Sequence, residues 1–152
     1  MPASARLARV HAAIEALQRL SELFITRRVA LAREVGLTEQ QWRVLEEIST
    51  ERFMPSMFAR QRQSSAAAVS KTLRQLLDKE LVVAAIRPGD GRQRHYTLSP
   101  AGERTLRELR RLRQVAVDTI WADLSETSLL RFAHTATQIA DAIEAFHERE
   151  HA

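Results

Sequence analysis

The sequence of 152 residues contains no cysteine, and aromatic residues make up only 5% of it. Without cysteine the chain cannot form disulfide bonds, thiolate metal sites or a cysteine redox sensor. Few aromatics beside 45% hydrophobic residues favour helices packed through Leu, Ala and Val over an aromatic-rich β-sandwich. The sequence has no run of about 18 apolar residues that would predict a transmembrane helix, and its N-terminus lacks the long apolar core of a signal peptide. We therefore expect a cytoplasmic protein.

Lysine is also rare, because only Lys71 and Lys79 accompany the arginines among the 23 basic residues. With 19 acidic residues the formal net charge is +4. The whole excess lies in the middle third, since the ten basic residues between Arg43 and Arg94 exceed the six acidic ones by four. A basic middle between nearly neutral ends suggests a module that binds a polyanion.

Apolar residues at spacings of three and four predict a long amphipathic helix over residues 5–34, which Gly36 closes. Thr38 and Gln41 form a capping box before a second helix. The apolar stripe of this second helix consists of Trp42, Leu45 and Ile48. A short helix should follow Pro55, with its inward-facing side chains being Met57 and Phe58.

Ser65 is the predicted N-cap of the next helix, AAAVSKTLRQLLDKEL. One face of it is formed by Ala66, Val69, Leu73, Leu76 and Leu77. Two β-rich runs, at 82–86 and 95–98, then predict a hairpin. Ser99 and Pro100 are typical of a helix start, and helices are expected over 100–122 and from Ser125 onward.

This order predicts a mainly α fold with a small β-hairpin wing, that is, a winged helix-turn-helix with a helical dimerisation bundle. The DNA-binding domain would span residues 36–102, and the dimerisation region residues 1–35 and 103–152. Long apolar stripes near both ends support a dimer bundle, namely Leu7, Val10, Ile14, Leu17, Ile139, Ile143 and Phe146. An intramolecular helical cap is the alternative.

The helix after Ser65 carries candidate DNA contacts on its outer face. Small side chains at Ala67, Ala68 and Ser70 would let the helix approach base edges closely. Lys71 and Arg74, one turn apart, can reach phosphates or guanine. Free backbone N–H groups near Ser64 and Ser65 would add a phosphate site at the helix start.

The stretch PGDGRQRHYTLSPAG, residues 88–102, uses two of the four glycines, Gly89 and Gly91, on one arginine-bearing turn. Asp90 lies two residues before Arg92 and could hold its guanidinium by a bidentate pair. An oriented Arg92 suits the minor groove, and Arg94 follows it at the strand start. A solvated hairpin tip is the alternative.

The C-terminal residues His147–His151 match H-E-x-x-H, a zinc-binding pattern when it lies on a helix. Here the motif has charged surroundings and is followed by a single residue, so neither a dry pocket nor a downstream third ligand is expected. No Ser/His/Asp spacing or Gly-rich phosphate loop is present either. We therefore expect no enzyme, no metal and no cofactor, with a zinc hydrolase kept only as a third alternative.

The sequence resembles the MarR family of transcriptional regulators over nearly all its length. LTEQQWRVLEEI is similar to the family's second helix, AAAVSKTLRQLLDKELV to its recognition helix, and DGRQRHYTLSPAG to its wing and the next helix start. The resemblance implies an obligate homodimer on a pseudo-palindromic DNA operator. It also implies DNA contacts at Ser65, Ala67, Ser70, Lys71, Arg74 and the wing Arg92.

Family members often release DNA when a small phenolic or aromatic acid binds, so the resemblance favours a ligand-responsive repressor. His11, Trp42 and Arg43 are candidate ligand contacts. The chain departs from the family where Arg62-Gln63-Ser64 replaces a Leu-Gly-Leu-like turn, and Arg62 could there add a phosphate contact. The alternative function is a helical interaction protein whose basic middle binds an acidic protein partner.

Overall fold

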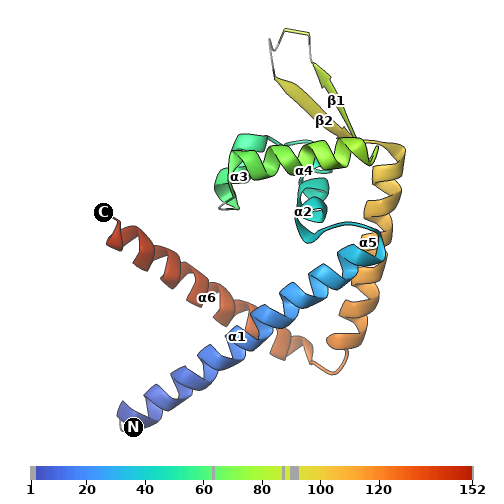
Figure 1. The fold of residues 1–152 in the computed structure, drawn as a ribbon. Coiled ribbons are helices and arrows are strands. Elements are labelled where there is room, and N and C mark those ends of the chain that lie inside the picture. The colour runs from blue at the N-terminus through green and yellow to red at the C-terminus, as the bar shows by residue number, and fades with distance from the viewer. Residues whose placement is uncertain (1–2, 63, 87, 90–92, 152) are drawn as a thin grey trace. The chain divides into compact units, whose positions relative to one another are not determined.

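The computed structural model describes residues 3–62, 64–86, 88–89 and 93–151 (Figure 1). Its elements are α1 (Ala3–Glu34), α2 (Glu39–Ile48), α3 (Pro55–Gln61), α4 (Ala66–Asp78), β1 (Val82–Ile86), β2 (Arg94–Leu98), α5 (Pro100–Ile120) and α6 (Glu126–Glu150). The chain divides within α5 into unit 1, Met1–Arg113, and unit 2, Gln114–Ala152. The predicted order of elements is confirmed.

The junction between α1 and α2 is built from local hydrogen bonds. Gly36 has a φ of +73°, and the Leu37 N–H donates to the Ala32 carbonyl oxygen at 2.9 Å. This bond closes α1 in a left-handed turn, where glycine is favoured because it has no Cβ. The Thr38 hydroxyl accepts from the Gln41 N–H, and the Gln41 side-chain oxygen accepts from the Thr38 N–H. The predicted capping box is therefore confirmed.

The core of unit 1 forms where α2 and α4 pack together. Trp42, Val44 and Leu45 of α2 are fully buried, as are Val69 and Leu76 of α4. Burying each such side chain contributes roughly 1.5–3 kcal/mol. The remaining buried apolar residues are Leu31, Ala32, Leu37, Ile48, Phe58, Ala59, Leu73, Val82, Leu106 and Leu109. The predicted stripe of α2 is thus confirmed.

Two apolar residues lie outside this core, contrary to the sequence prediction. Met57 is 47% exposed, whereas its neighbour Phe58 is buried. The short helix α3 directs Phe58 and Ala59 inward, and this orientation turns Met57 toward solvent. Ala66 is also exposed, because it is the first residue of α4 and precedes the turn at which that helix meets the core.

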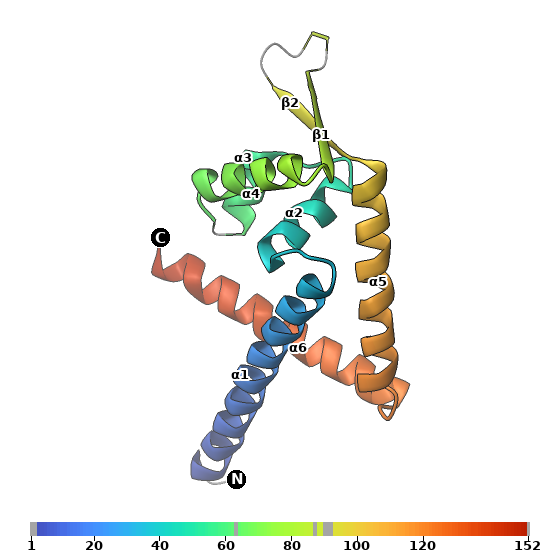
Figure 2. The same ribbon diagram turned by 45° about the vertical axis from the view of Figure 1, so that its right-hand side comes forward.

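The hairpin begins directly after α4. Its strands pair antiparallel, from Val82 opposite Leu98 to Ile86 opposite Arg94. In both views the hairpin projects beyond α4, as expected of a wing (Figures 1 and 2). Strand β2 then leads through Ser99 into α5.

Close packing fixes the base of the hairpin against the start of α5. The Ser99 hydroxyl donates to the Glu80 carbonyl oxygen at 2.6 Å and accepts from the Gly102 N–H at 3.0 Å. A Cβ at Gly102 would lie only 2.0 Å from the Leu81 carbonyl oxygen. Glycine is therefore required at this position, and the Ser99 N-cap predicted from sequence is confirmed.

The terminal helices bury little. In α1 the first apolar residues are exposed, and α6 contains no buried residue. Ser125 caps α6 as predicted, because its hydroxyl accepts from the Ser128 N–H at 3.2 Å. Within the described ranges, none of the helices combines the length and hydropathy that a membrane span requires.

Candidate nucleic-acid interface

Helix α4 presents one solvent-facing side and one core-facing side. The Ser65 hydroxyl accepts from the Ala68 N–H at 3.0 Å and so caps the helix. The predicted contact residues that lie exposed on α4 or at its cap are Ser65, Ala67, Ala68, Ser70, Lys71 and Arg74. The opposite side is anchored by the buried residues Val69, Thr72, Leu73 and Leu76. The buried side thus fixes which side chains face outward.

The turn before α4 differs from the sequence expectation in one respect. The Ser64 N–H donates to the Ala59 carbonyl oxygen at 2.8 Å, so it is not free to bind a phosphate. Ser64 is half-buried. This bond closes the end of α3, which the sequence does not reveal because it depends on how the chain turns. Any anion contact at this helix start would have to come from Ser65 and the following residues.

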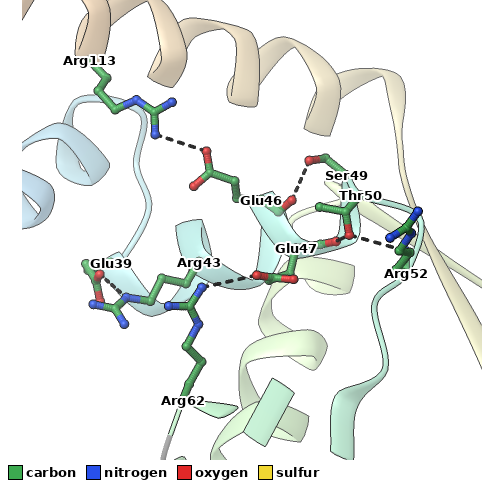
Figure 3. Close-up of polar contacts among 9 residues, drawn as sticks. All are labelled: Glu39, Arg43, Glu46, Glu47, Ser49, Thr50, Arg52, Arg62 and Arg113. Atoms are coloured by element: carbon green, nitrogen blue, oxygen red, sulfur yellow. Dashed lines mark hydrogen bonds and ion pairs between the residues drawn. The ribbon is translucent and has the colours of Figure 1, made fainter. Parts of the chain in front are cut away.

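Arg62 lies in the turn where the sequence has Arg62-Gln63-Ser64 in place of a Leu-Gly-Leu-like turn. Its side chain forms an ion pair with α2. Its guanidinium lies 3.3 Å from a Glu47 carboxylate oxygen (Figure 3). The same group lies 6.0 Å from the centre of the Phe58 ring. The Arg62 side chain is still 46% exposed. Arg62 therefore ties the turn to the end of α2 and keeps part of its guanidinium accessible.

The wing supplies the last group of predicted contacts. Arg94 is exposed at the start of β2, where it pairs with Ile86 of β1. Asp90 and Arg92, which we predict to form a minor-groove contact, lie outside the described residues. The orientation of Arg92 by Asp90 stays a prediction.

The ion pairs of unit 1 leave the outer face of α4 positively charged. Acidic side chains of α2 are paired with arginines, as Glu46 is with Arg113 at 3.5 Å (Figure 3). In contrast, Lys71, Arg74 and Arg94 form no ion pair with any described residue. These cations are accessible to an external anion.

The three predicted ligand contacts do not gather at one place within unit 1. Trp42 is fully buried, and the Arg28 guanidinium lies 4.1 Å from the centre of its ring. Arg43 pairs with Glu39, which also binds Arg28 at 2.9 Å. His11 is exposed on α1 and lies seventeen residues before Arg28. This separation corresponds to roughly 25 Å along the helix axis. Sequence reasoning missed Arg28, because its contact with Trp42 depends on how two helices pack.

Residues 147–151 lie at the C-terminal end of α6, and their side chains are exposed. Within the described part of the chain, no three His, Asp or Glu side chains come together as ligands for a metal ion.

A helix pair followed by an antiparallel hairpin, with a basic outer face on the second helix, defines a winged helix-turn-helix protein. Residues 35–93 match the model of the MarR family. The match covers the helix pair and most of the hairpin, and the fold of the chain is that of solved MarR-family transcription regulators. A search of curated proteins finds no significant match.

Solved structures of the family superpose on most of the chain. A MarR-family transcription regulator gives a TM-score of 0.87 at 16% identity, covering 95% of this chain and 97% of its own. The Staphylococcus aureus MepR–DNA complex gives 0.70 at 16% identity, covering 84% and 94%. Staphylococcus aureus MarR in complex with salicylate and kanamycin gives 0.74 at 16% identity, covering 95% and 99%. At these identities the likeness shows the fold.

Proposed function

We propose that this protein is a dimeric, sequence-specific DNA-binding transcription regulator that acts as a repressor. The observation that carries the proposal is the outer face of α4, where Ser70, Lys71 and Arg74 are exposed and the two cations lack ion pairs among the described residues. A helix of this kind fits the DNA major groove, in which short side chains allow close approach and cations reach guanine or phosphate. The similarity to MepR, solved as a DNA complex, supports it.

The dimer is proposed from apolar side chains that unit 1 and unit 2 leave exposed. On α1 these are Leu7, Val10, Ile14, Leu20, Leu23, Phe24 and Ile25. From α5 onward they are Val115, Val117, Ile120, Leu124, Leu130, Phe132, Ile139, Ile143 and Phe146. So many exposed apolar side chains on a single chain favour burial against a second copy. Residues 1–35 and 103–152 would form this interface, and residues 36–102 the DNA-binding domain.

Truncation tests the dimer directly. Removal of residues 1–20 should give a monomer or an aggregate, measured by light scattering after gel filtration, and should abolish binding to the DNA operator. A truncated chain that stays monodisperse and binds DNA like the full chain would contradict the dimer bundle.

A small aromatic or phenolic acid is the effector we propose, with support from the salicylate complex of Staphylococcus aureus MarR. The cluster of Arg28, Glu39, Arg43 and Trp42 offers suitable chemistry, because a carboxylate can replace Glu39 on either guanidinium. The indole Nε1 of Trp42 is buried and lacks a hydrogen-bond partner among the described residues. This donor would suit a phenolic oxygen.

Binding isotherms test the DNA-binding function. The wild-type chain should bind a duplex that spans an inverted repeat in its own promoter more tightly than scrambled DNA. Arg74→Ala should weaken operator binding by about 1–3 kcal/mol if Arg74 contacts a base. As a control, Arg111→Gln changes the charge of an α5 residue paired with Glu108 and should leave the preference intact. Equal affinity of the wild type for both duplexes would refute sequence-specific binding.

A broad thermal-shift screen of aromatic acids tests the effector. Salicylate or a related acid should raise the melting temperature of the protein and release the operator, and Arg43→Gln should reduce both effects. A screen in which no acid shifts melting or releases DNA would contradict ligand control.

A further inference from the structure

Two adjoining clefts lie beside β2 of the wing. The larger, of about 720 Å³, is lined by the loop before α3, residues 51–54, with Pro55 and Ser56, and by residues 93–96 of the wing. The smaller, of about 260 Å³, is lined by residues of α4 and shares Pro55, Arg94 and Tyr96 with the first. Together they form one trough, which runs from Ser70 and Arg74 on the outer face of α4 to the loop at 51–54.

The trough is predominantly basic. Its cationic side chains include Arg74 at the α4 end, Arg94 in the middle and Arg52 at the loop end. All three are exposed, and none forms an ion pair with a described residue. Glu51 is the one carboxylate among the residues that line either cleft.

The loop that carries Arg52 is held in place by its neighbours. Glu51 has a φ of +59°, and the Arg52 N–H donates to the Thr50 hydroxyl (Figure 3). The Phe53 ring packs edge-on against Tyr96 of β2 with centroids 6.1 Å apart, and against Phe58 at 5.7 Å. The loop is thus anchored to both α3 and the wing, while the Arg52 side chain stays exposed.

We infer that this trough seats the phosphodiester backbone of the bound DNA, and that Arg52 is a phosphate-binding residue. The inference rests on the proposed DNA-binding function. Because the trough continues from the outer face of α4, a strand whose bases are read by that helix could pass Arg74, Arg94 and Arg52 in turn. Three exposed cations in a row suit a polyanion better than a single carboxylate, and a phosphate contact depends on charge more than on sequence.

The test is a salt series of binding isotherms on a random-sequence duplex, using the full-length chain. Arg52→Gln should bind more weakly at low salt. The steepness of the fall of log K with log salt should decrease by about 0.9 for each phosphate that the variant no longer neutralises. A fourfold rise in salt should therefore weaken the wild type about 3.5-fold more than the variant for each such phosphate. Arg52→Lys should keep the slope, since a phosphate contact needs only the charge.

Two further variants control for charge and folding. Glu51→Gln removes the negative charge at the loop end and should strengthen binding. Arg111→Gln neutralises an arginine of α5 outside the trough and should bind like the wild type. Thermal melts of the Arg52 and Glu51 variants should match the wild type, because both side chains are exposed.

The outcomes separate this inference from the function it rests on. A wild-type chain that binds no duplex at any salt concentration overturns both. A wild-type slope for Arg52→Gln, alongside weakened binding by Lys71→Ala, overturns the phosphate contact alone. If Arg52→Gln binds DNA like the wild type but binds salicylate more weakly, the cleft lined by Arg52 is a small-molecule site. This result would likewise overturn the inference.

Discussion

Gln41 and Gln75 form a hydrogen bond that joins α2 directly to α4. The Gln41 Nε2 donates to the Gln75 Oε1 at 3.0 Å, while the Gln41 Oε1 completes the capping box with Thr38. Gln41 is only 4% exposed. Its amide therefore has little access to water if Gln75 is removed.

Replacing Gln75 with methionine should leave the Gln41 Nε2 unpaired. A buried polar group left without a partner destabilises a protein by about 1–3 kcal/mol. Gln75 itself is half-buried, so water can partly replace it, and we expect a loss of about 1 kcal/mol, the lower end of that range. Gln41→Met should be more damaging, because it also removes an acceptor of the capping box.

A double-mutant cycle with Gln41→Met and Gln75→Met isolates the hydrogen bond between the two amides. Gln41→Met and the double variant both lack the capping contribution of Gln41, so that contribution cancels. Urea unfolding at one fixed protein concentration should show that the double variant loses less stability than the two single variants together. The coupling should be about 1 kcal/mol. Additive losses, within error, would mean that the hydrogen bond between the two amides contributes nothing to the stability of the fold.

Three single positions give further predictions. Gly102→Ala would place a Cβ 2.0 Å from the Leu81 carbonyl oxygen and should cost about 1–3 kcal/mol of stability or more; a wild-type urea midpoint would contradict this close approach. Arg92→Ala should weaken operator binding by roughly 1–3 kcal/mol and lower the salt slope by about one, whereas wild-type isotherms at every salt concentration would make the turn a solvated tip. The hydrogen bond from Arg111 holds the pKa of the Glu108 carboxyl below its ordinary value. This pair therefore supports the folded state at neutral pH, and the support is lost as the pH falls through that lowered pKa. An NMR titration of the Glu108 carboxyl that is unchanged in Arg111→Gln would refute the assignment.

The features that sequence predicts well depend on short-range chemistry. Thr38, Ser65, Ser99 and Ser125 each cap a helix as predicted, because a hydroxyl that accepts from an N–H three residues later needs no tertiary context. The buried stripe of α2 follows from its spacing in the same way. These elements together predict the winged helix-turn-helix.

The features that sequence misses depend on how distant segments meet. Arg28 lies over the ring of Trp42 only because α1 and α2 pack at their junction. The Ser64 N–H is occupied because the chain turns back onto Ala59. Arg52 shares a cleft with Arg94 although forty-two positions separate them in the sequence. No local pattern marks any of these three contacts.

Apolar periodicity has opposite consequences in the middle of the chain and at its ends. In α2 and α4 the apolar stripe is buried by the same chain, so this part of unit 1 has its own core. Apolar residues also recur along α1 and α6, but in α6 and in α1 up to Ile25 most of these side chains stay exposed. If a second copy covers them, dimerisation and DNA binding become one equilibrium, because two α4 helices can read adjacent major grooves only when the interface fixes their spacing near one DNA turn. The Arg28–Glu39 ion pair joins α1 to α2, and the Gln41–Gln75 bond joins α2 to α4, the helix that we propose reads DNA.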